Sequence, residues 1–266
     1  MTLGLWDIIY IVTGIAEGLL CLALILRTIP FLRNEHRFMA AALFLFAMAS
    51  LLLSDSYWIV YTLMRPDTRM PMAANEIAEN ASFLLLAAAL GTVFDENRIP
   101  AVREMICAAL FAVACTVLWI IWTGEWVEDI IGGIAFGYFL CVCVRALKQA
   151  DVLKKREWRL LGLFSGLIIL ILFLANEVPG HYVLPLEILS YVFMFAVLFA
   201  LLVKTLRTVR NGGDEKAGMA LSFSLYAWSV STMFLGEYWV YITAWFLSFL
   251  TLPLMQRSVR KEAEAR

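Results

Sequence analysis

The sequence predicts an all-α fold, a polytopic transmembrane helical bundle of about nine spans that forms a single integral membrane domain over residues 1–266. The first observation is composition: 62% of the residues are apolar and 16% are charged, with a mean hydropathy of +0.82. Soluble domains are about 45–50% apolar and about 25% charged. The second is that the apolar residues form blocks of about 20, the length that crosses a bilayer core. The third is that nearly all Lys and Arg residues fall in alternate connections between these blocks.

The predicted spans follow the apolar blocks in chain order. They are Ile8–Leu26, Phe38–Met64, Asn75–Phe94, Met105–Trp122, Ile130–Leu147, Leu160–Leu174, Leu186–Val203, Gly218–Phe234 and Tyr238–Met255. The last block, from residue 217 to 255, would be about 60 Å long as a single helix, roughly twice the thickness of the bilayer core. Gly236 and Glu237 interrupt it near its middle, so we expect two spans there.

The basic residues predict the orientation of the bundle. The connections after the first, third, fifth and seventh spans, together with the C-terminal tail, hold 19 of the 21 Lys and Arg residues. The opposite side holds Arg65 and Arg69. Because cytoplasmic connections carry the excess of Lys and Arg, we expect the N-terminus outside and the C-terminus in the cytoplasm. The membrane would be a cell membrane, of the bacterial inner or plasma type.

Two echoes in the outer connections suggest an internal repeat. Gly124-Glu125-Trp126 recurs as Gly236-Glu237-Tyr238 after 112 positions, and Glu76-Ile77 recurs as Glu187-Ile188 after 111 positions. One interpretation is a first helix followed by two parallel four-helix halves, a 1+4+4 duplication of a kind known in transporters. The alternative is that short outer hairpins favour Gly, Glu and aromatic residues in any case.

Acidic residues at membrane depth are the main indication of a functional site. Glu17 lies near the middle of the first span, on one face with Tyr10, and Asp55 lies about nine residues inside the outer end of the second span. Such residues usually face a bundle interior or a wet cavity. The third span opens with polar residues that share one side of a helix, Asn75, Glu76, Glu79 and Asn80. We therefore predict an outward-facing ligand- or ion-binding pocket that comprises Glu17, Asp55, Tyr57, Glu76, Glu79 and Asn80.

Structural roles are the alternative for these residues. Glu76 and Glu79 lie in the first turns of the third span, where carboxylates favour the positive end of the helix dipole. Arg65 and Arg69 in the adjoining connection are candidates to neutralise them. The two deeper carboxyl groups, if protonated, would donate interhelical hydrogen bonds, which is a packing role.

The charge of the outer side predicts the kind of ligand. It carries ten carboxylates besides the two buried ones, against two arginines, a field that draws cations and repels anions. The outer aromatic residues are Trp6, Tyr57, Trp58, Tyr61, Trp119, Trp122, Trp126, Tyr238 and Trp239. Aromatic rings beside carboxylates suit an organic cation. The alternative is the ordinary aromatic belt of a membrane interface.

Several classes of function are disfavoured. The basic clusters abut span ends, so we expect no nucleic-acid partner. His36 and His181 lie on opposite sides of the predicted membrane, which excludes a His-based zinc site, and no lysine lies within a predicted span, which excludes a retinal Schiff base. The five cysteines sit in apolar stretches and are unsuited to disulfides or zinc. We expect no metal and no cofactor, and the sequence favours a protein that is not an enzyme.

The leading hypothesis is a small transporter or permease-like protein for a cationic or proton-coupled solute. The lipid bilayer and that solute are the expected partners, and the sequence leaves any protein partner open. A membrane-embedded module that senses a ligand or binds a partner without transport is the second hypothesis. The third is an intramembrane lipid hydrolase that uses the carboxyl groups for acid–base chemistry.

Overall fold

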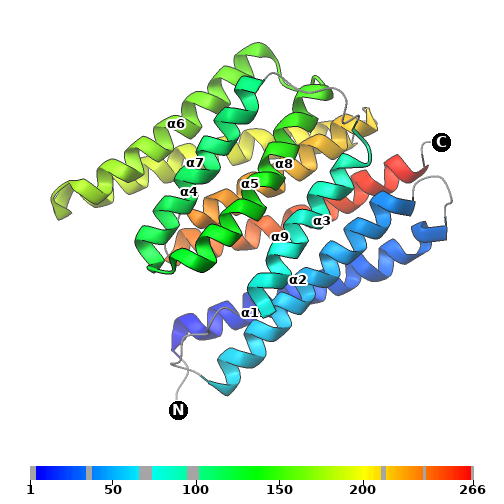
Figure 1. Ribbon diagram of the computed structural model, residues 1–266, viewed down its shortest axis with the longest axis horizontal. Helices are drawn as coiled ribbons and strands as arrows, with labels where there is room; N and C mark the ends of the chain where they lie inside the picture. Colours follow the sequence, from blue (N-terminus) through cyan, green and yellow to red (C-terminus); the bar gives the residue numbers. More distant parts are fainter. Residues whose placement is uncertain are drawn as a thin grey trace.

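The computed structural model describes residues 4–33, 38–65, 74–94, 102–210, 214–235 and 238–264 (Figure 1). All regular secondary structure within these ranges is helical, which confirms the all-α fold class. The elements are α1 (Leu5–Thr28), η1 (Ile29–Arg33, a short 3₁₀ helix), α2 (Phe38–Met64), α3 (Ala74–Gly91), α4 (Val102–Thr123), α5 (Trp126–Gln149), α6 (Lys155–Glu177), α7 (Gly180–Arg210), α8 (Glu215–Phe234) and α9 (Tyr238–Glu264).

Successive α-helices run in alternate directions and mostly pack against their neighbours in the chain (Figure 1). The alternation gathers the starts of α1, α3, α5, α7 and α9 at one end of the bundle, which we call the acidic end. Asp7, Glu76 and Asp129 lie there in first turns of helices. The opposite end, here the basic end, collects the Lys and Arg residues of the last turns of α1, α5, α7 and α9.

The helices extend beyond the predicted apolar spans at several ends. The spans predicted over 186–203 and 238–255 lie inside the longer α7 and α9. Hydropathy falls where charged residues begin, but Lys and Arg near a helix C-terminus interact favourably with the helix dipole, so the helix continues past the apolar block. The predicted interruption at Gly236 and Glu237 lies outside the described residues, and α8 and α9 are separate helices on either side of it.

Seven helical segments of the described chain are long and apolar enough to cross a membrane. They are Leu5–Leu32, Phe38–Met64, Val102–Thr123, Trp126–Gln149, Lys155–Glu177, Gly180–Arg210 and Trp239–Glu262. The two helices outside this set, α3 and α8, are also among the shortest, at 18 and 20 residues. Polar residues lower their hydropathy, namely Glu and Asn at the start of α3 and Ser and Thr along α8. The structure is thus that of a helical membrane bundle.

Helix α8 lies in the interior of this bundle. Every residue from Ala217 to Thr232 is buried, and the helix contacts α3, α4, α5, α7 and α9. Its hydroxyl groups bond mainly to carbonyls of the preceding turn, as Ser229 does to Leu225 and Thr232 to Trp228. A hydroxyl satisfied in this way is tolerated in an apolar interior. Helix α8 therefore needs no apolar outer face, which explains its lower hydropathy.

Apolar packing fills the basic half of the bundle. A core of buried residues joins the later turns of α1, α3 and α5 to the earlier turns of α2 and to α8 and α9, with Phe44, Leu90 and Phe139 fully buried. A second core joins α4, α6, α7 and α8 around Ile168 and Met194. This second core reaches into the acidic half between α4, α6 and α8, where Leu118, Leu172 and Leu235 are buried, whereas the rest of the acidic half contains the functional-site candidate.

Helices α4 and α5 approach each other closely through a glycine. A Cβ atom built on Gly133 would lie 2.1 Å from Oγ1 and 2.9 Å from Cβ of Thr116. Real Cβ atoms do not come so near, so this contact requires glycine in α5. The same pair of helices is linked at the basic end by an ion pair of 3.1 Å between Lys148 and Glu104.

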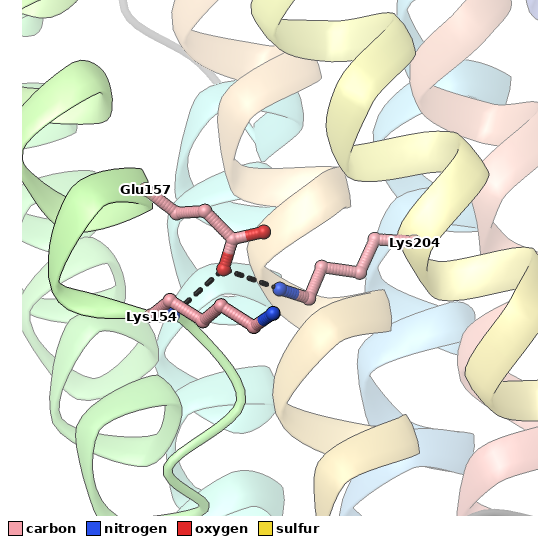
Figure 2. A network of polar contacts seen from close by, with 3 residues as sticks. All are labelled: Lys154, Glu157 and Lys204. Carbon is pink, nitrogen blue, oxygen red and sulfur yellow. Dashed lines mark hydrogen bonds and ion pairs between the residues drawn. The ribbon is translucent and has the colours of Figure 1, made fainter.

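Figure 2 shows a polar network at the basic end that links the start of α6 to α7. Oε2 of Glu157 accepts a hydrogen bond of 2.7 Å from the backbone N–H of Lys154 and one of 2.6 Å from Nζ of Lys204. Nearby, Nζ of Lys261 in α9 donates to the carbonyl of Val209 at the C-terminal end of α7, at 2.7 Å. The Glu157–Lys204 contact thus holds α6 to α7, and the Lys261 contact ties α7 to α9.

Candidate functional site

A cavity of about 600 Å³ occupies the acidic half of the bundle. Side chains of α1, α2, α3, α4, α5, α8 and α9 line it, whereas α6 and α7 contribute no lining residue among those described. These seven helices close around the cavity because α1 contacts α2 and α9, α2 contacts α3, α3 contacts α5, and α8 contacts α5, α4 and α9. Its volume is within the range of small-molecule sites, roughly 300–1,000 Å³.

The cavity extends from the acidic end to the middle of the helices. Thr123 and Glu125 line it where α4 connects to α5. At the other extreme, Glu17 lies 12 residues after the start of α1, a depth of about 18 Å at 1.5 Å rise per residue. Beyond this depth the apolar core begins, with Cys21 and Leu24 buried on the next turns of α1. The cavity is therefore a deep pocket at one end of the bundle.

Five of the six residues predicted for the site line this cavity: Glu17, Asp55, Glu76, Glu79 and Asn80. The structure does not bring the sixth, Tyr57, to it. Tyr57 is 38% exposed and stacks on Tyr61, with 6.4 Å between ring centroids. Because successive helical residues are separated by about 100°, a residue two positions from Asp55 points to the other side of α2. Trp58, three positions from Asp55, shares its face and lines the cavity.

Glu17 is held where α1 comes close to its neighbours. Gly14 and Gly18 bracket it at four-residue spacing, the small-xxx-small arrangement that lets membrane helices approach. A Cβ atom on Gly14 would lie 3.4 Å from Ile59 and 3.7 Å from Trp245, and one on Gly18 would lie 3.4 Å from a methyl group of Leu52. The side chain of Glu17 is 4% exposed, and its Oε2 accepts a hydrogen bond from Nε1 of Trp245 in α9.

Asp55 and Asn75 present unsatisfied oxygen atoms. Oδ2 of Asp55 and Oδ1 of Asn75 are buried, and neither has a hydrogen-bond partner among the described groups. A buried polar atom without a partner costs free energy, and in a native structure it points to a ligand or another unoccupied interaction. Both residues line the cavity. Helix α5 comes close to Asn80 on the neighbouring wall of the cavity: a Cβ atom built on Gly132 would lie 3.6 Å from Oδ1 of Asn80.

Carboxyl groups dominate the charge of the cavity. Those in its lining are Glu17, Asp55, Glu76, Glu79, Glu125, Glu128 and Asp129. No Lys, Arg or His is among the described residues that line it. Arg65 is outside the lining, and Arg69, the other predicted neutralising residue, lies outside the described residues. Negative charges that share a cavity of low dielectric constant repel one another strongly, so the cavity favours the entry of positive charge.

One of these carboxyl groups also orders the α4–α5 connection. Oγ1 of Thr123 donates to Oδ2 of Asp129 at 2.5 Å and accepts from the backbone N–H of Glu125 at 3.2 Å. Between them, Gly124 has φ of +76°, a left-handed conformation that favours glycine. The connection at the mouth of the cavity is thus fixed by side chains of the cavity itself.

Aromatic rings form a continuous wall along one side of the cavity. We call Tyr10, Trp58, Tyr241 and Trp245 the aromatic wall; all four line the cavity, from α1, α2 and α9. The centroid of the Tyr10 ring lies 6.2 Å from the ring centroid of Trp58, 6.0 Å from that of Tyr241 and 6.4 Å from that of Trp245. Trp245 lies 6.2 Å from Trp58 and 6.1 Å from Tyr241. Trp119 of α4 extends the wall by stacking on Tyr241 at 6.1 Å.

Sequence reasoning missed part of this lining. Tyr241, Trp245 and Ser248 recur at i, i+4 and i+7, the spacing of one helix face. That stripe was available as a signal, but within an apolar block it is indistinguishable from residues that face lipid. Tyr226 of the buried α8 also lines the cavity and had no distinguishing signal.

The described residues show no arrangement typical of a metal centre or a histidine-dependent enzyme. They contain no group of three or more His, Cys, Asp or Glu side chains placed to hold a metal ion. The predicted spans left His181 in the connection before the span over 186–203, but it lies in the first turn of α7, where it is exposed and contacts the ring of Tyr182. His36 lies outside the described residues. Comparisons with family models, with curated proteins and with solved structures find no match to this chain.

Proposed function

We propose that this protein is a small transporter or permease-like membrane protein that binds a cationic or proton-coupled solute in the cavity of its acidic half. One observation carries the proposal. A cavity of about 600 Å³ reaches the middle of a helical membrane bundle and is lined by carboxyl groups, with no basic side chain in its described lining. Solute-binding sites of transporters lie near the bilayer midplane. Glu17 lies near the middle of α1, which supports a site at that depth.

The proposal includes a topology of nine spans with the N-terminus outside and the C-terminus in the cytoplasm. Helices α3 and α8 then also cross the membrane, shielded from lipid largely by their neighbours. The concentration of Lys and Arg at the basic end supports a cytoplasmic location for that end. The acidic end, and with it the mouth of the cavity, then faces outside. The predicted 1+4+4 duplication adds nothing to the proposal, since α6 and α7 contribute no described lining residue.

The chemistry of binding follows from the cost of buried negative charge. Carboxylates at membrane depth are expensive unless paired. A cation or protons that enter the cavity remove this cost, and the carboxyl groups of Glu17, Asp55 and Glu79 converge there without a lining Lys or Arg. Release on the other side requires a second arrangement of the helices, because in this one the apolar core separates Glu17 from the basic end.

Amide substitutions in purified protein test the proposal. Protein reconstituted in liposomes is assayed for uptake of small cations and for proton flux. Asp55→Asn and Glu17→Gln keep the shape of the side chains but remove their charge, and each is expected to lower uptake at least about tenfold. Glu177→Gln serves as the matched control, because Glu177 is an exposed carboxylate at the end of α6 and is outside the cavity lining. Uptake that is unchanged in both amide variants of the cavity contradicts the proposal.

A binding module without transport is the second candidate, and the one-ended shape of the cavity favours it. The same reconstituted protein separates the two functions. Saturable binding that depends on Asp55, without flux into liposomes, identifies a sensing or partner-binding module. The third hypothesis, a lipid hydrolase, relies on the carboxyl groups alone, since no His lines the described cavity. Release of fatty acid or head group from lipid by the wild type but not by Asp55→Asn is its test.

A further inference from the structure

The aromatic wall lies beside the deepest carboxyl group of the cavity. Trp245 belongs to the wall and also donates its indole N–H to Glu17, so ring and carboxyl group are adjacent. Trp58 of the wall lies one turn from Asp55 on the same face of α2. The rings thus stand next to both carboxyl groups that lie deepest in α1 and α2, rather than in a belt on the outer surface.

This combination of groups discriminates between kinds of cation. A divalent or alkali metal ion is bound by several oxygen ligands at short, defined distances. Among the described residues no group of three or more candidate ligand side chains is placed to hold a metal ion. A quaternary ammonium group has no N–H to donate, is bulky, and binds over the faces of aromatic rings with a carboxylate nearby. Several contiguous aromatic rings stabilise such an ion when it binds, but they stabilise a hydrated metal ion little.

We propose that the cavity binds an organic cation with a quaternary, N-methylated ammonium group, which lies against Tyr10, Trp58, Tyr241 and Trp245 with Glu17 and Asp55 as its counter-charges. This inference deepens the proposed function and rests on it. The unpartnered Oδ2 of Asp55 supplies the second, independent indication of a ligand in the same cavity. The volume of about 600 Å³ leaves room for further atoms of the ligand beyond the ammonium group.

Binding to the purified wild-type protein is the first test. Choline is titrated by calorimetry at constant ionic strength, alongside its neutral isostere, in which a tert-butyl group replaces the trimethylammonium group, and alongside potassium and magnesium chloride. We expect choline to bind at least about tenfold more tightly than the neutral isostere, since only the charged form gains the cation–π and carboxylate interactions. Neither potassium nor magnesium is expected to compete at comparable concentrations.

Ring-removing and ring-retaining variants form the second test. Trp58→Leu and Tyr241→Leu each remove one ring and are expected to weaken choline binding about 2- to 30-fold, the range of single cation–π contacts. Tyr241→Phe keeps the ring and is expected to bind within about twofold of wild type. Trp126→Leu is the matched control, because Trp126 is 63% exposed and outside the cavity lining. Monodispersity and thermal unfolding show whether each variant is folded.

The outcomes separate this inference from the proposed function. Metal ions that bind as tightly as choline, or a neutral isostere that binds equally well, overturn the inference. So do folded Leu variants that bind choline like the wild type. If uptake of another cation still depends on Asp55 in those cases, the proposed function stands. If no cation binds and no flux depends on the carboxyl groups, both are overturned. The wild-type comparison of choline with its isostere remains decisive even if a Leu variant does not fold.

Discussion

Nε1 of Trp245 in α9 donates a hydrogen bond to Oε2 of Glu17 in α1, so a carboxyl group in the middle of the first helix is bonded to α9. The two residues are 228 positions apart. The bond ties together two walls of the cavity, and it satisfies an oxygen of a side chain that is 4% exposed. Glu17 is thus a group in the cavity lining and also part of the contact between α1 and α9.

Trp245→Phe is expected to destabilise the protein by about 1 kcal/mol. The change keeps an aromatic ring but removes the donor, and a buried acceptor without its donor costs about 1–3 kcal/mol, with smaller values measured in membrane proteins. Thermal unfolding in detergent measures the effect. Trp239→Phe is the control, because Trp239 is in the same helix but 64% exposed. If the bond contributes, the double variant Trp245→Phe with Glu17→Met, in which the acceptor is removed as well, loses less than the sum of the two single changes.

Gly133→Ala is expected to disrupt the α4–α5 contact and to cost about 1–3 kcal/mol of stability. The added methyl group would lie 2.1 Å from Oγ1 of Thr116, so the two helices must separate or distort. Gly162→Ala in α6 is the control, since a Cβ there meets nothing within 4 Å. Thr116→Ala is expected to recover part of the loss, because it removes two of the three clashing atoms. An equal melting temperature for the Gly133 and Gly162 variants contradicts the close approach.

Two substitutions at Glu157 separate its hydrogen bond to the backbone from its ion pair. Glu157→Gln loses the charge pair with Lys204 but retains an oxygen for the N–H of Lys154 (Figure 2). The side chains of Lys204 and Glu157 are 28% and 41% exposed, so solvent screens the pair and we expect a loss below about 1 kcal/mol. Glu157→Ala also removes the helix-start contact and is expected to cost about 1 kcal/mol more. Added salt should reduce the difference in stability between wild type and Glu157→Gln. If Glu157→Gln costs as much stability as Glu157→Ala, the backbone hydrogen bond and the ion pair do not contribute separately as expected here.

Single cysteines that bracket α3 and α8 test whether both helices cross the membrane. They are introduced at Arg65, Thr92, Asp214 and Trp239, all exposed at helix ends, in a background in which the exposed Cys107 is replaced by serine. With nine spans, an impermeant maleimide added to intact cells labels positions 65 and 239 and leaves 92 and 214 unlabelled until the membrane is opened. Labelling of both members of either pair from outside shows that the helix between them does not span.

The site could be predicted from sequence where it depends on spacing within one helix. Glu76, Glu79 and Asn80 share a face of α3 because residues three and four apart coincide on a helix. The same rule explains the exclusion of Tyr57, which is two positions from Asp55 and therefore on another face. Contacts between distant segments had no such signal. Nothing in the sequence relates Trp245 to Glu17, because the packing of α1 against α9 depends on the whole bundle.

The fold was predictable to a similar degree. The all-helical class and most boundaries follow from apolar blocks and the charges between them. The ends of α7 and α9 do not, since a helix continues beyond the apolar residues that identify it. The interior position of α8 could not be predicted from the sequence either, because burial by neighbouring helices and burial by lipid both favour residues that avoid water.

The burial of α8 has a consequence for biosynthesis. A segment enters the bilayer on its own when its residues partition favourably into lipid, and Ser, Thr and Lys residues weaken that tendency. Helix α8 has hydroxyl residues along its length and is surrounded by protein from Ala217 to Thr232. We therefore expect α8 to insert together with α9, its most extensive contact, after α1 to α7 are in place. In the proposed topology, a chain truncated after Phe234 would then leave its last segment outside the membrane during translation, open to proteases of the cytoplasm.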